Sequence, residues 1–420
     1  MSQILFLSRW FPYPPSNGSK LRIFNLLRGL AEAGHSVRLL SFVEPDARAV
    51  DVDRLRPYCQ VVQTTPWRQF APESRRARLG LFSATPRSVR DTWSPEMSQM
   101  IEDELATRRP DLIIASQIDT ASYVSAGSDI PALFEEVELG LMYEQYAAAT
   151  TASQRLRYGL TWAKHRRYLT SLLSRFTACT VVSQREQRLL AAAAPGYPPA
   201  EIIPNCIHLP GYRVAVDQST RRSGVPTYQS TDLPTYQSTN LPSHQLIFTG
   251  AFTYHVNYEG AIWFVSEVFP RVRAQIGDVT LTITGNHANL PFPAASGVTL
   301  TGFVDDVRPL IASSAVCVAP IWQGGGTRLK ILEAMALGAP VVATSKGAEG
   351  LDVQDGVHLL IADEPAAFAE AVVRLLRDPQ LRQHLIEQAL ALIEQHYSCE
   401  MVMPRFLQLV HRLVSRTELR

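Results

Sequence analysis

Short apolar runs alternate with longer amphipathic segments along all 420 residues, and few folds accommodate that pattern. The short runs are apolar on both faces, which is typical of parallel strands covered by helices on each side of a sheet. The longer segments carry apolar residues at helical spacing, such as Leu27 and Leu30 in the helix expected at 19–33. The pattern therefore predicts an α/β fold with two tandem, doubly wound, Rossmann-like domains.

The expected elements form two series, one in each half of the chain. Strands are expected at 4–8, 37–43, 111–116, 132–135, 177–182 and 201–203, and then at 246–250, 279–284, 298–300, 315–319, 340–344 and 359–361. In the second half, helices are expected at 258–276, 304–312, 326–337 and 365–376. Strands that alternate with helices in this way favour parallel sheets.

The domain boundaries follow from these series. We predict an N-terminal domain at 1–205, a connection at 206–245, a C-terminal domain at 246–396 and a terminal helix at 397–420. The connection contains an eight-residue repeat, PTYQSTDL followed by PTYQSTNL and a shortened third copy. So few polar copies can neither bury an apolar face nor build a solenoid. A flexible insert is the favoured interpretation, and a binding role is the alternative.

Composition excludes several classes of function. The chain has 40 Lys and Arg against 39 Asp and Glu, which argues against disorder and against nucleic acid as a partner. The five cysteines form no CxxC pair and the histidines do not cluster, so we expect neither a disulfide framework nor a bound metal. We find no leader and no apolar stretch long enough to span a bilayer, and we expect a cytoplasmic protein.

The richest candidate site is the loop IWQGGGTRLKILEAM at 321–335, which follows an apolar strand and opens a helix. Consecutive glycines let backbone N–H groups approach an anion, and the helix N-terminus adds partial positive charge. Arg328 and Lys330 in the first turn oppose the helix dipole, at about 0.3–1 kcal/mol each, unless an anion is bound. Glu333, further along the helix, can accept hydrogen bonds from a ribose diol. The loop predicts a diphosphate site, and an ordinary glycine turn is the alternative.

Other phosphate and metal motifs are weaker. The chain has no Walker A run, and no GxGxxG pattern follows the first strand. Asp51-Val52-Asp53 matches the metal-binding DxD of some sugar-transfer enzymes. It stands in a polar stretch, where chance or helix capping is the favoured interpretation.

Two segments combine basic and apolar side chains. Residues 145–184 contain six cations and no acid, and 67–90 contain six arginines. Basic residues beside aromatic and leucine side chains suit an anionic membrane surface, at about 1 kcal/mol for each cation. Such a surface would place the protein peripherally at the inner face of a membrane. Packed helices with solvated arginines are the alternative, and the sequence leaves both open.

Several motifs resemble a known family, the retaining glycosyltransferases with the GT-B fold, in the glycogen-synthase-like group (family 4). The most specific is GGGTRLKILEAMALGAPVV at 324–342, supported by TGFVDD at 301–306, PYPPSNGSKLR at 12–22 and IPN at 203–205. The resemblance implies two domains that face each other across a cleft. It also implies sugar transfer from a nucleotide-diphosphate sugar to a glycan or lipid-linked acceptor, with no cofactor and no metal.

The resemblance also implies roles for particular residues. Glu333 would bind the donor ribose, and Arg328 or Lys330 would face the diphosphate. The remaining donor contacts would come from Gly18, Val304, Gly325, Gly326 and Thr327. Gly325 stands where the family often has a glutamate that contacts the donor sugar, and the basic residue usual after the strand at 246–250 is missing.

The acceptor side is expected at Glu135 and Glu136, which end a predicted strand. Paired acids at this position are suited to orient an acceptor hydroxyl or to accept its proton. Acids that cap the next helix are the alternative. A non-catalytic sugar-nucleotide or glycan-binding protein with the same fold is the alternative function, and Gly325 favours it.

Overall fold

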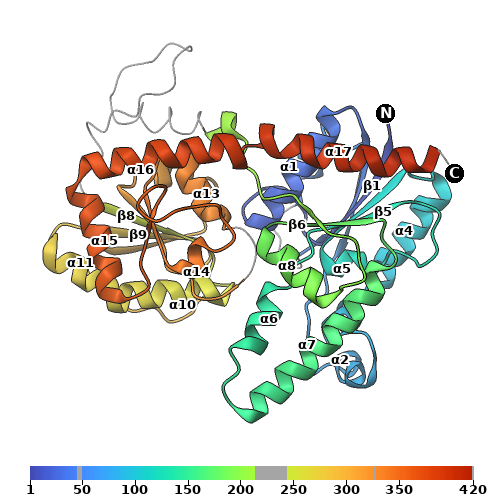
Figure 1. Ribbon diagram of the computed structural model, residues 1–420, viewed down its shortest axis with the longest axis horizontal. Coiled ribbons are helices and arrows are strands. Elements are labelled where there is room, and N and C mark those ends of the chain that lie inside the picture. The colour runs from blue at the N-terminus through green and yellow to red at the C-terminus, as the bar shows by residue number, and fades with distance from the viewer. Residues whose placement is uncertain (45–49, 213–243, 325–327, 419–420) are drawn as a thin grey trace. The chain divides into compact units, whose positions relative to one another are not determined.

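The computed structural model describes residues 1–44, 50–212, 244–324 and 328–418. They divide into two compact units, Met1–Asn205 with Val402–Arg420, and Cys206–Met401. Each unit is built on one parallel sheet with helices packed around it (Figure 1). The predicted α/β class is therefore confirmed. The two complete octapeptide copies lie outside the described residues.

The first unit contains a seven-stranded sheet in the order β3-β2-β1-β4-β5-β6-β7. The strands are β1 (Gln3–Ser8), β2 (Ser36–Val43), β3 (Val61–Pro66), β4 (Leu112–Ser116), β5 (Ala132–Glu135), β6 (Ala178–Val181) and β7 (Glu201–Ile202). The strand order reverses between β1 and β4, which pair directly. The sequence analysis missed β3, because an edge strand with mostly exposed or half-exposed side chains lacks a continuous apolar run.

Helices cover this sheet and form its core with the strands. They are α1 (Gly18–Glu32), α2 (Arg75–Leu79), α3 (Arg87–Thr92), α4 (Pro95–Thr107), α5 (Gln117–Ala121), α6 (Gly140–Ala147), α7 (Ala152–Leu173) and α8 (Gln184–Ala193), with short 3-10 turns η1 (Val52–Leu55) and η2 (Gly80–Phe82). The Asn17 side chain caps α1 by accepting the Lys20 N–H. In the DxD segment, Asp53 pairs with Arg56 on the surface.

The second unit contains a six-stranded sheet in the order β10-β9-β8-β11-β12-β13. The strands are β8 (Gln245–Thr249), β9 (Thr280–Thr284), β10 (Val298–Gly302), β11 (Val316–Ala319), β12 (Val341–Ala343) and β13 (Leu360–Ile361). The order reverses at β8, which lies between β9 and β11. This reversal decides where a ligand can bind.

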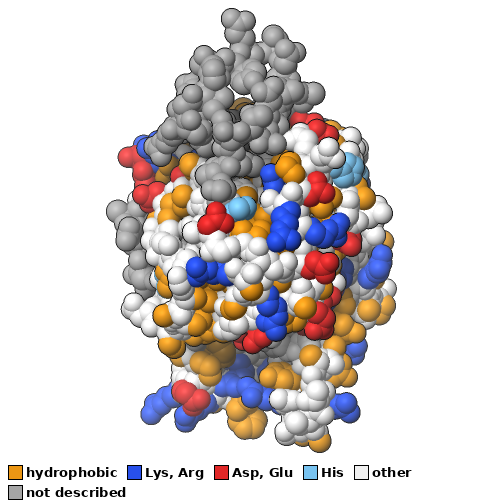
Figure 2. Space-filling model, turned by 90° about the vertical axis from the view of Figure 1, so that its left-hand side faces the viewer, with side chains coloured by type: hydrophobic (Ala, Val, Ile, Leu, Met, Phe, Trp, Pro, Cys, Tyr) orange, Lys and Arg blue, Asp and Glu red, His pale blue; other side chains and the backbone are white. Residues whose placement is uncertain are grey.

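The helices of the second unit include those predicted, and α14 (Ser345–Ala348) and α16 (Pro379–Leu392) in addition. The others are α10 (His255–Trp263), α11 (Phe269–Gln275), α12 (Arg308–Ala312), α13 (Leu329–Ala336), α15 (Pro365–Arg377) and the start of α17 (Cys399–Glu418). A π-helical turn, η3 (Phe264–Val268), joins α10 to α11, and Pro270 follows it. Proline donates no backbone N–H, which explains the irregular turn within the predicted helix. On its visible part, the face with α11 and α15 mixes acidic, basic and apolar side chains (Figure 2).

Candidate functional site

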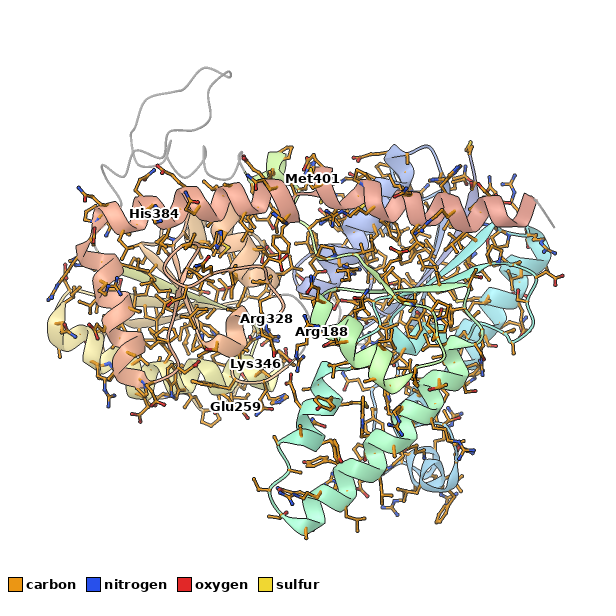
Figure 3. All side chains as sticks on the ribbon, in the orientation of Figure 1. Arg188, Glu259, Arg328, Lys346, His384 and Met401 are labelled. Carbon is orange, nitrogen blue, oxygen red and sulfur yellow. The ribbon has the colours of Figure 1, made fainter. Side chains whose placement is uncertain are left out.

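The loops after β8 and β11 meet at the carboxyl edge of the second sheet. Because β8 and β11 are neighbours at the reversal of strand order, this is where open α/β sheets bind ligands. Gly250 has φ +144, and a Cβ there would lie 2.7 Å from the amide group of Asn257. Arg328 and Lys346, which follow the paired strands β11 and β12, lie at this same edge (Figure 3).

Lys330 brings a cation from α13 to the end of β8. Its Nζ donates to the Thr249 carbonyl at 2.7 Å and to Asn257 Oδ1 at 2.8 Å. Burial lowers the pKa of Lys330 to about 8. These bonds use two of its three N–H donors. Lys330 therefore supplies positive charge beside β8, where the sequence lacks the basic residue usual in the family.

Arg328 folds back onto the glycine loop. The sequence analysis expected Arg328 in the first helical turn. The helix instead begins at Leu329, and Arg328 is its N-cap residue. Its Nη2 donates to the carbonyls of Gln323 and Gly324. Gly324 has φ +100, and a Cβ there would lie 2.6 Å from Tyr254 Oη. Arg328 thus holds the two backbone carbonyls of Gln323 and Gly324 that follow β11. Gly325, Gly326 and Thr327 lie outside the described residues.

Glu333 is held by a tyrosine that the sequence analysis did not identify. Tyr212, which is 5% exposed, donates its hydroxyl to Glu333 Oε1 at 2.8 Å. Burial raises the pKa of Glu333, while the Tyr212 hydrogen bond and the charges of Arg308 and Lys330 lower it. A carboxylate has about four lone-pair positions, so this one contact leaves room for a ligand diol.

Arg308 holds the segment that carries Tyr212. Its Nη1 donates to the Gly211 carbonyl at 3.0 Å, and its Nε and Nη2 donate to the two oxygens of Asp306, each at 2.8 Å. Val304, the predicted nucleobase contact, is half-buried in the same loop. No sequence signal links Tyr212 to Glu333, because the two lie 121 residues apart.

We expect Tyr212→Phe to raise the donor KM by about tenfold, since a hydrogen bond to a charged group contributes about 1.5 kcal/mol. The Tyr212 hydrogen bond lowers the pKa of Glu333, so the substitution raises that pKa. The acidic limb of kcat/KM should therefore move to higher pH. The measurement is a pH profile of donor-dependent transfer. Tyr258→Phe is the matched control, because its hydroxyl bonds the Pro291 carbonyl. An unchanged acidic limb would contradict the role of Tyr212.

In the first unit, Glu135 lies in a buried ion pair. Glu135 is 0% exposed and accepts from Arg22 Nε at 2.6 Å and from Ser116 Oγ at 2.8 Å. Arg22 also donates to the Ile203 carbonyl at 2.9 Å and to Asn205 Oδ1 at 3.1 Å. Arg22, the last residue of the motif at 12–22, thus contacts the IPN motif at 203–205. This geometry favours a structural role for Glu135 over proton transfer.

Glu136 has a different environment. Its Oε2 accepts from Gln117 Nε2 at 3.0 Å, and Gln117 Oε1 accepts from Trp10 Nε1 at 3.1 Å. Burial, opposed by the charge of Arg22 and assisted by the charges of Glu135 and Glu138, raises the pKa of Glu136 to about 8. Gln117 and Glu136 have φ +67 and +59, a strained conformation that clusters at functional sites. Gly18, also predicted to act in this unit, is the first residue of α1.

The described residues contain no group of three or more His, Cys, Asp or Glu side chains placed to hold a metal ion. Within the same ranges, we find no helix of sufficient length and apolar character to cross a membrane.

The fold of the chain is that of the GT-B glycosyltransferases. Sucrose-phosphate synthase from Thermosynechococcus elongatus superposes with a TM-score of 0.69 at 18% identity, over 99% of this chain and 100% of that one. Alr3699/HepE from Anabaena, solved with UDP-glucose, superposes with a TM-score of 0.62 at 16% identity, over 98% of this chain and 100% of that one. At these identities the likeness concerns the fold alone.

Two protein-family models match the sequence of the chain and identify its family. Residues 17–206 match the glycosyl transferase 4-like domain, and residues 243–378 match glycosyl transferases group 1. The chain belongs to this family, the GT-B glycosyltransferases of the family 4 type, and the predicted family is confirmed.

Curated relatives match part of the chain. An uncharacterized 44.6 kDa protein in the cps region of Klebsiella pneumoniae is 26% identical over 168 residues, which are 37% of this chain and 43% of that protein. The phosphatidyl-myo-inositol mannosyltransferase of Mycobacterium leprae (strain TN) is 33% identical over 129 residues, 29% of this chain and 34% of that protein. The matches therefore span less than half the length of either relative.

Proposed function

We propose that the protein is a retaining glycosyltransferase that moves a sugar from a nucleotide-diphosphate sugar to a glycan or lipid-linked acceptor. The observation that carries the proposal is the placement of Glu333 and Lys330 together at the point where the strand order of the second unit reverses. A carboxylate there suits a ribose diol, and a cation beside a glycine loop suits a diphosphate. Family membership and the UDP-glucose complex of Alr3699/HepE support the same donor class.

In this proposal the second unit stabilises the leaving diphosphate without a metal. Lys330 supplies a cation at the end of β8, Arg328 donates to the Gly324 carbonyl, and backbone N–H groups of the glycine loop would face the phosphates. Such fixed electrostatic stabilisation is commonly the largest part of catalysis. Val304 would contact the base, and the role of Gly18 stays a prediction.

Glu136 is the better candidate on the acceptor side, because Glu135 is held by Arg22. Gln117 and Trp10 fix the Glu136 carboxyl group at the carboxyl edge of the first sheet. From there it would orient an acceptor hydroxyl or accept its proton.

The rate of transfer should rise with pH toward about 8, because burial raises the pKa of Glu136 to about 8 and the proton must leave before the carboxylate can act. We expect Glu136→Gln to flatten this rise and to lower kcat by about 10²–10⁴-fold, the usual contribution of a general base. The measurement is kcat against pH at saturating donor. Glu102→Gln, an exposed change on α4, is the control. A Glu136→Gln profile identical to that of the unmodified protein would exclude Glu136.

Thermal unfolding with UDP, GDP and ADP and their sugars, each with and without a chelator, tests the donor assignment. A ligand at a hundred times its Kd adds about 2.7 kcal/mol to the free energy of unfolding, a shift of several degrees at this size. One diphosphate that raises Tm in the presence of chelator would support a metal-free donor site. No response to any of them would contradict the assignment of Glu333 and Lys330.

A second candidate is a non-catalytic sugar-nucleotide or glycan-binding protein, which Gly325 at the first family glutamate position favours. The two candidates differ in turnover. Binding of a diphosphate without release of sugar from any donor, with glycan and lipid-linked acceptors supplied, would support this second function.

We further propose that one surface of the first unit binds an anionic membrane. Along α7, Leu156, Leu160 and Lys164 follow at a spacing of four residues and so share one helix face. Lys164 Nζ donates to the Gly80 carbonyl, which brings this face beside η2. The exposed apolar side chains on it are Leu79, Leu81, Phe82, Leu156 and Leu160, and Phe82 is 93% exposed.

Cations surround these apolar side chains. Arg75, Arg76, Arg78, Arg155 and Arg157 are exposed on α2 and α7. Figure 2 shows basic and hydrophobic side chains together at the lower end of the molecule, at the level of the α6–α7 hairpin in Figure 1. Apolar side chains among arginines are suited to the headgroup region of anionic lipid.

We expect the protein to sediment with phosphatidylglycerol vesicles and not with phosphatidylcholine vesicles. Phe82→Ser should weaken binding by at least about tenfold, since burying a phenylalanine contributes about 1.5–3 kcal/mol. Leu290→Ser, at another exposed apolar residue, is the matched control. Equal sedimentation of Phe82→Ser and the unmodified protein would contradict this surface.

A further inference from the structure

The two chain segments that join the compact units are paired with each other. Cys206 is the first residue of the second unit and Met401 is its last. Between them, Ile207 and Ser398 form a parallel bridge. The Ile207 N–H donates to the Tyr397 carbonyl at 2.7 Å, and the Cys399 N–H donates to the Ile207 carbonyl at 2.9 Å.

Two cysteines face each other across this bridge. The Sγ atoms of Cys206 and Cys399 are 2.7 Å apart, although the residues are separated by 193 positions. An S–S bond is about 2.05 Å long, so a small movement of either side chain brings the sulfurs to bonding distance. Cys206 and Cys399 are 4% and 5% exposed, whereas Met401, two residues after Cys399, is 45% exposed (Figure 3). The pair therefore lies just below the surface.

The other three cysteines are as buried as the pair, but no sulfur–sulfur contact is found for them in the described residues. Cys59, Cys179 and Cys317 are buried, and burial raises the pKa of each thiol to about 12. Such thiols ionise too weakly to react at neutral pH. They serve as internal controls for the pair.

We propose that Cys206 and Cys399 form a redox modification site, at which a low-molecular-weight disulfide such as oxidised glutathione converts the two thiols to an intramolecular disulfide. One cysteine loses its proton, attacks a sulfur of oxidised glutathione and forms a mixed disulfide, releasing one reduced glutathione. The second cysteine loses its proton and attacks the protein sulfur of that mixed disulfide, releasing the second glutathione. Two cysteine thiols are oxidised, one glutathione disulfide is reduced, and the two protons leave on the released thiols.

The new bond would join the two connections covalently beside the Ile207–Ser398 bridge. The bridge could then no longer open by separation of the two segments. We therefore expect slower hydrogen exchange of the Ile207 and Cys399 amides, the two N–H groups bonded across it. This expectation concerns the connections themselves and is independent of the proposed sugar transfer.

The test equilibrates the full-length native protein in buffers of increasing oxidised-to-reduced glutathione ratio. Remaining thiols are then alkylated in denaturant, and the peptides are mapped by mass spectrometry. We expect one linked peptide that contains Cys206 and Cys399, two thiols fewer per chain, and full reversal by dithiothreitol. Cys206→Ser and Cys399→Ser should abolish the linked peptide, and Cys59→Ser should retain it.

Hydrogen exchange of oxidised and reduced protein provides a second measurement that does not depend on the variants. Slower exchange confined to the segments around Ile207 and Cys399 supports the site. Glutathione adducts without a linked peptide, or equal linkage among all five cysteines, would overturn it. Failure to form the link in fully oxidised glutathione would overturn it as well.

Discussion

Glu333→Gln should lower kcat/KM for the nucleotide-sugar donor by about 100-fold and leave the fold intact. The amide keeps the shape of the side chain but removes the charge that strengthens its hydrogen bonds to a ribose diol. Hydrogen bonds to a charged group contribute about 1.5–3 kcal/mol each, so the loss of two gives at least about 3 kcal/mol. Glu333 lies on α13, where Tyr212 already fixes one of its oxygens. The diol would therefore meet a carboxylate that needs no reorganisation.

The measurement is donor-dependent transfer at fixed acceptor, with thermal unfolding to confirm that the variant folds. Glu370→Gln, an exposed change on α15, is the matched control and should leave kcat/KM unchanged. A Glu333→Gln variant within about threefold of the unmodified protein would remove Glu333 from the donor site. Weaker diphosphate binding by this variant, in a protein without turnover, would point to the non-catalytic alternative.

Arg22→Met should destabilise the first unit by about 3–5 kcal/mol, the usual cost of leaving one partner of a buried ion pair uncompensated. Arg22 is 3% exposed and Glu135 is 0% exposed, so solvent cannot replace the lost contact. The substitution also leaves the Ile203 carbonyl and Asn205 Oδ1 without the donor they share. We expect the effect to be confined to the first unit.

Urea unfolding followed by hydrogen exchange measures this loss in each unit separately, because a chain with two units need not unfold in one step. Arg22→Met/Glu135→Leu should recover most of the lost stability, since well-packed apolar residues replace buried ion pairs at little cost. Arg56→Met breaks the exposed pair with Asp53 and should change the free energy of unfolding by less than about 1 kcal/mol. Equal losses for Arg22→Met and Arg56→Met would contradict the structural role of Arg22.

The sequence closely predicted the strand and the helix that flank the glycine loop. The strand expected at 315–319 is β11 (Val316–Ala319), and the helix expected at 326–337 is α13 (Leu329–Ala336). The short apolar run and the amphipathic run are local patterns, so a linear sequence records them. The same holds for the alternation that predicted both parallel sheets and for the motifs that predicted the family.

The hydrogen-bond partners of the candidate site residues could not be predicted from such local patterns. Lys330 donates to Thr249, 81 positions away, Glu135 accepts from Arg22 across 113, and Tyr212 reaches Glu333 across 121. The sequence analysis treated Glu135 and Glu136 as equivalent, and only their different neighbours distinguish them. It also placed Arg328 in the first helical turn, whereas its guanidinium group returns to the Gly324 carbonyl.

By itself, then, the sequence determined most of the elements, their order and the loop where a diphosphate site is expected. These properties depend on hydrophobic periodicity and on backbone freedom over a few consecutive residues. Tertiary structure decided which charged groups are held by protein partners. Hydrogen bonds and ion pairs act over a few ångströms in space, and only the folded chain brings distant residues that close together.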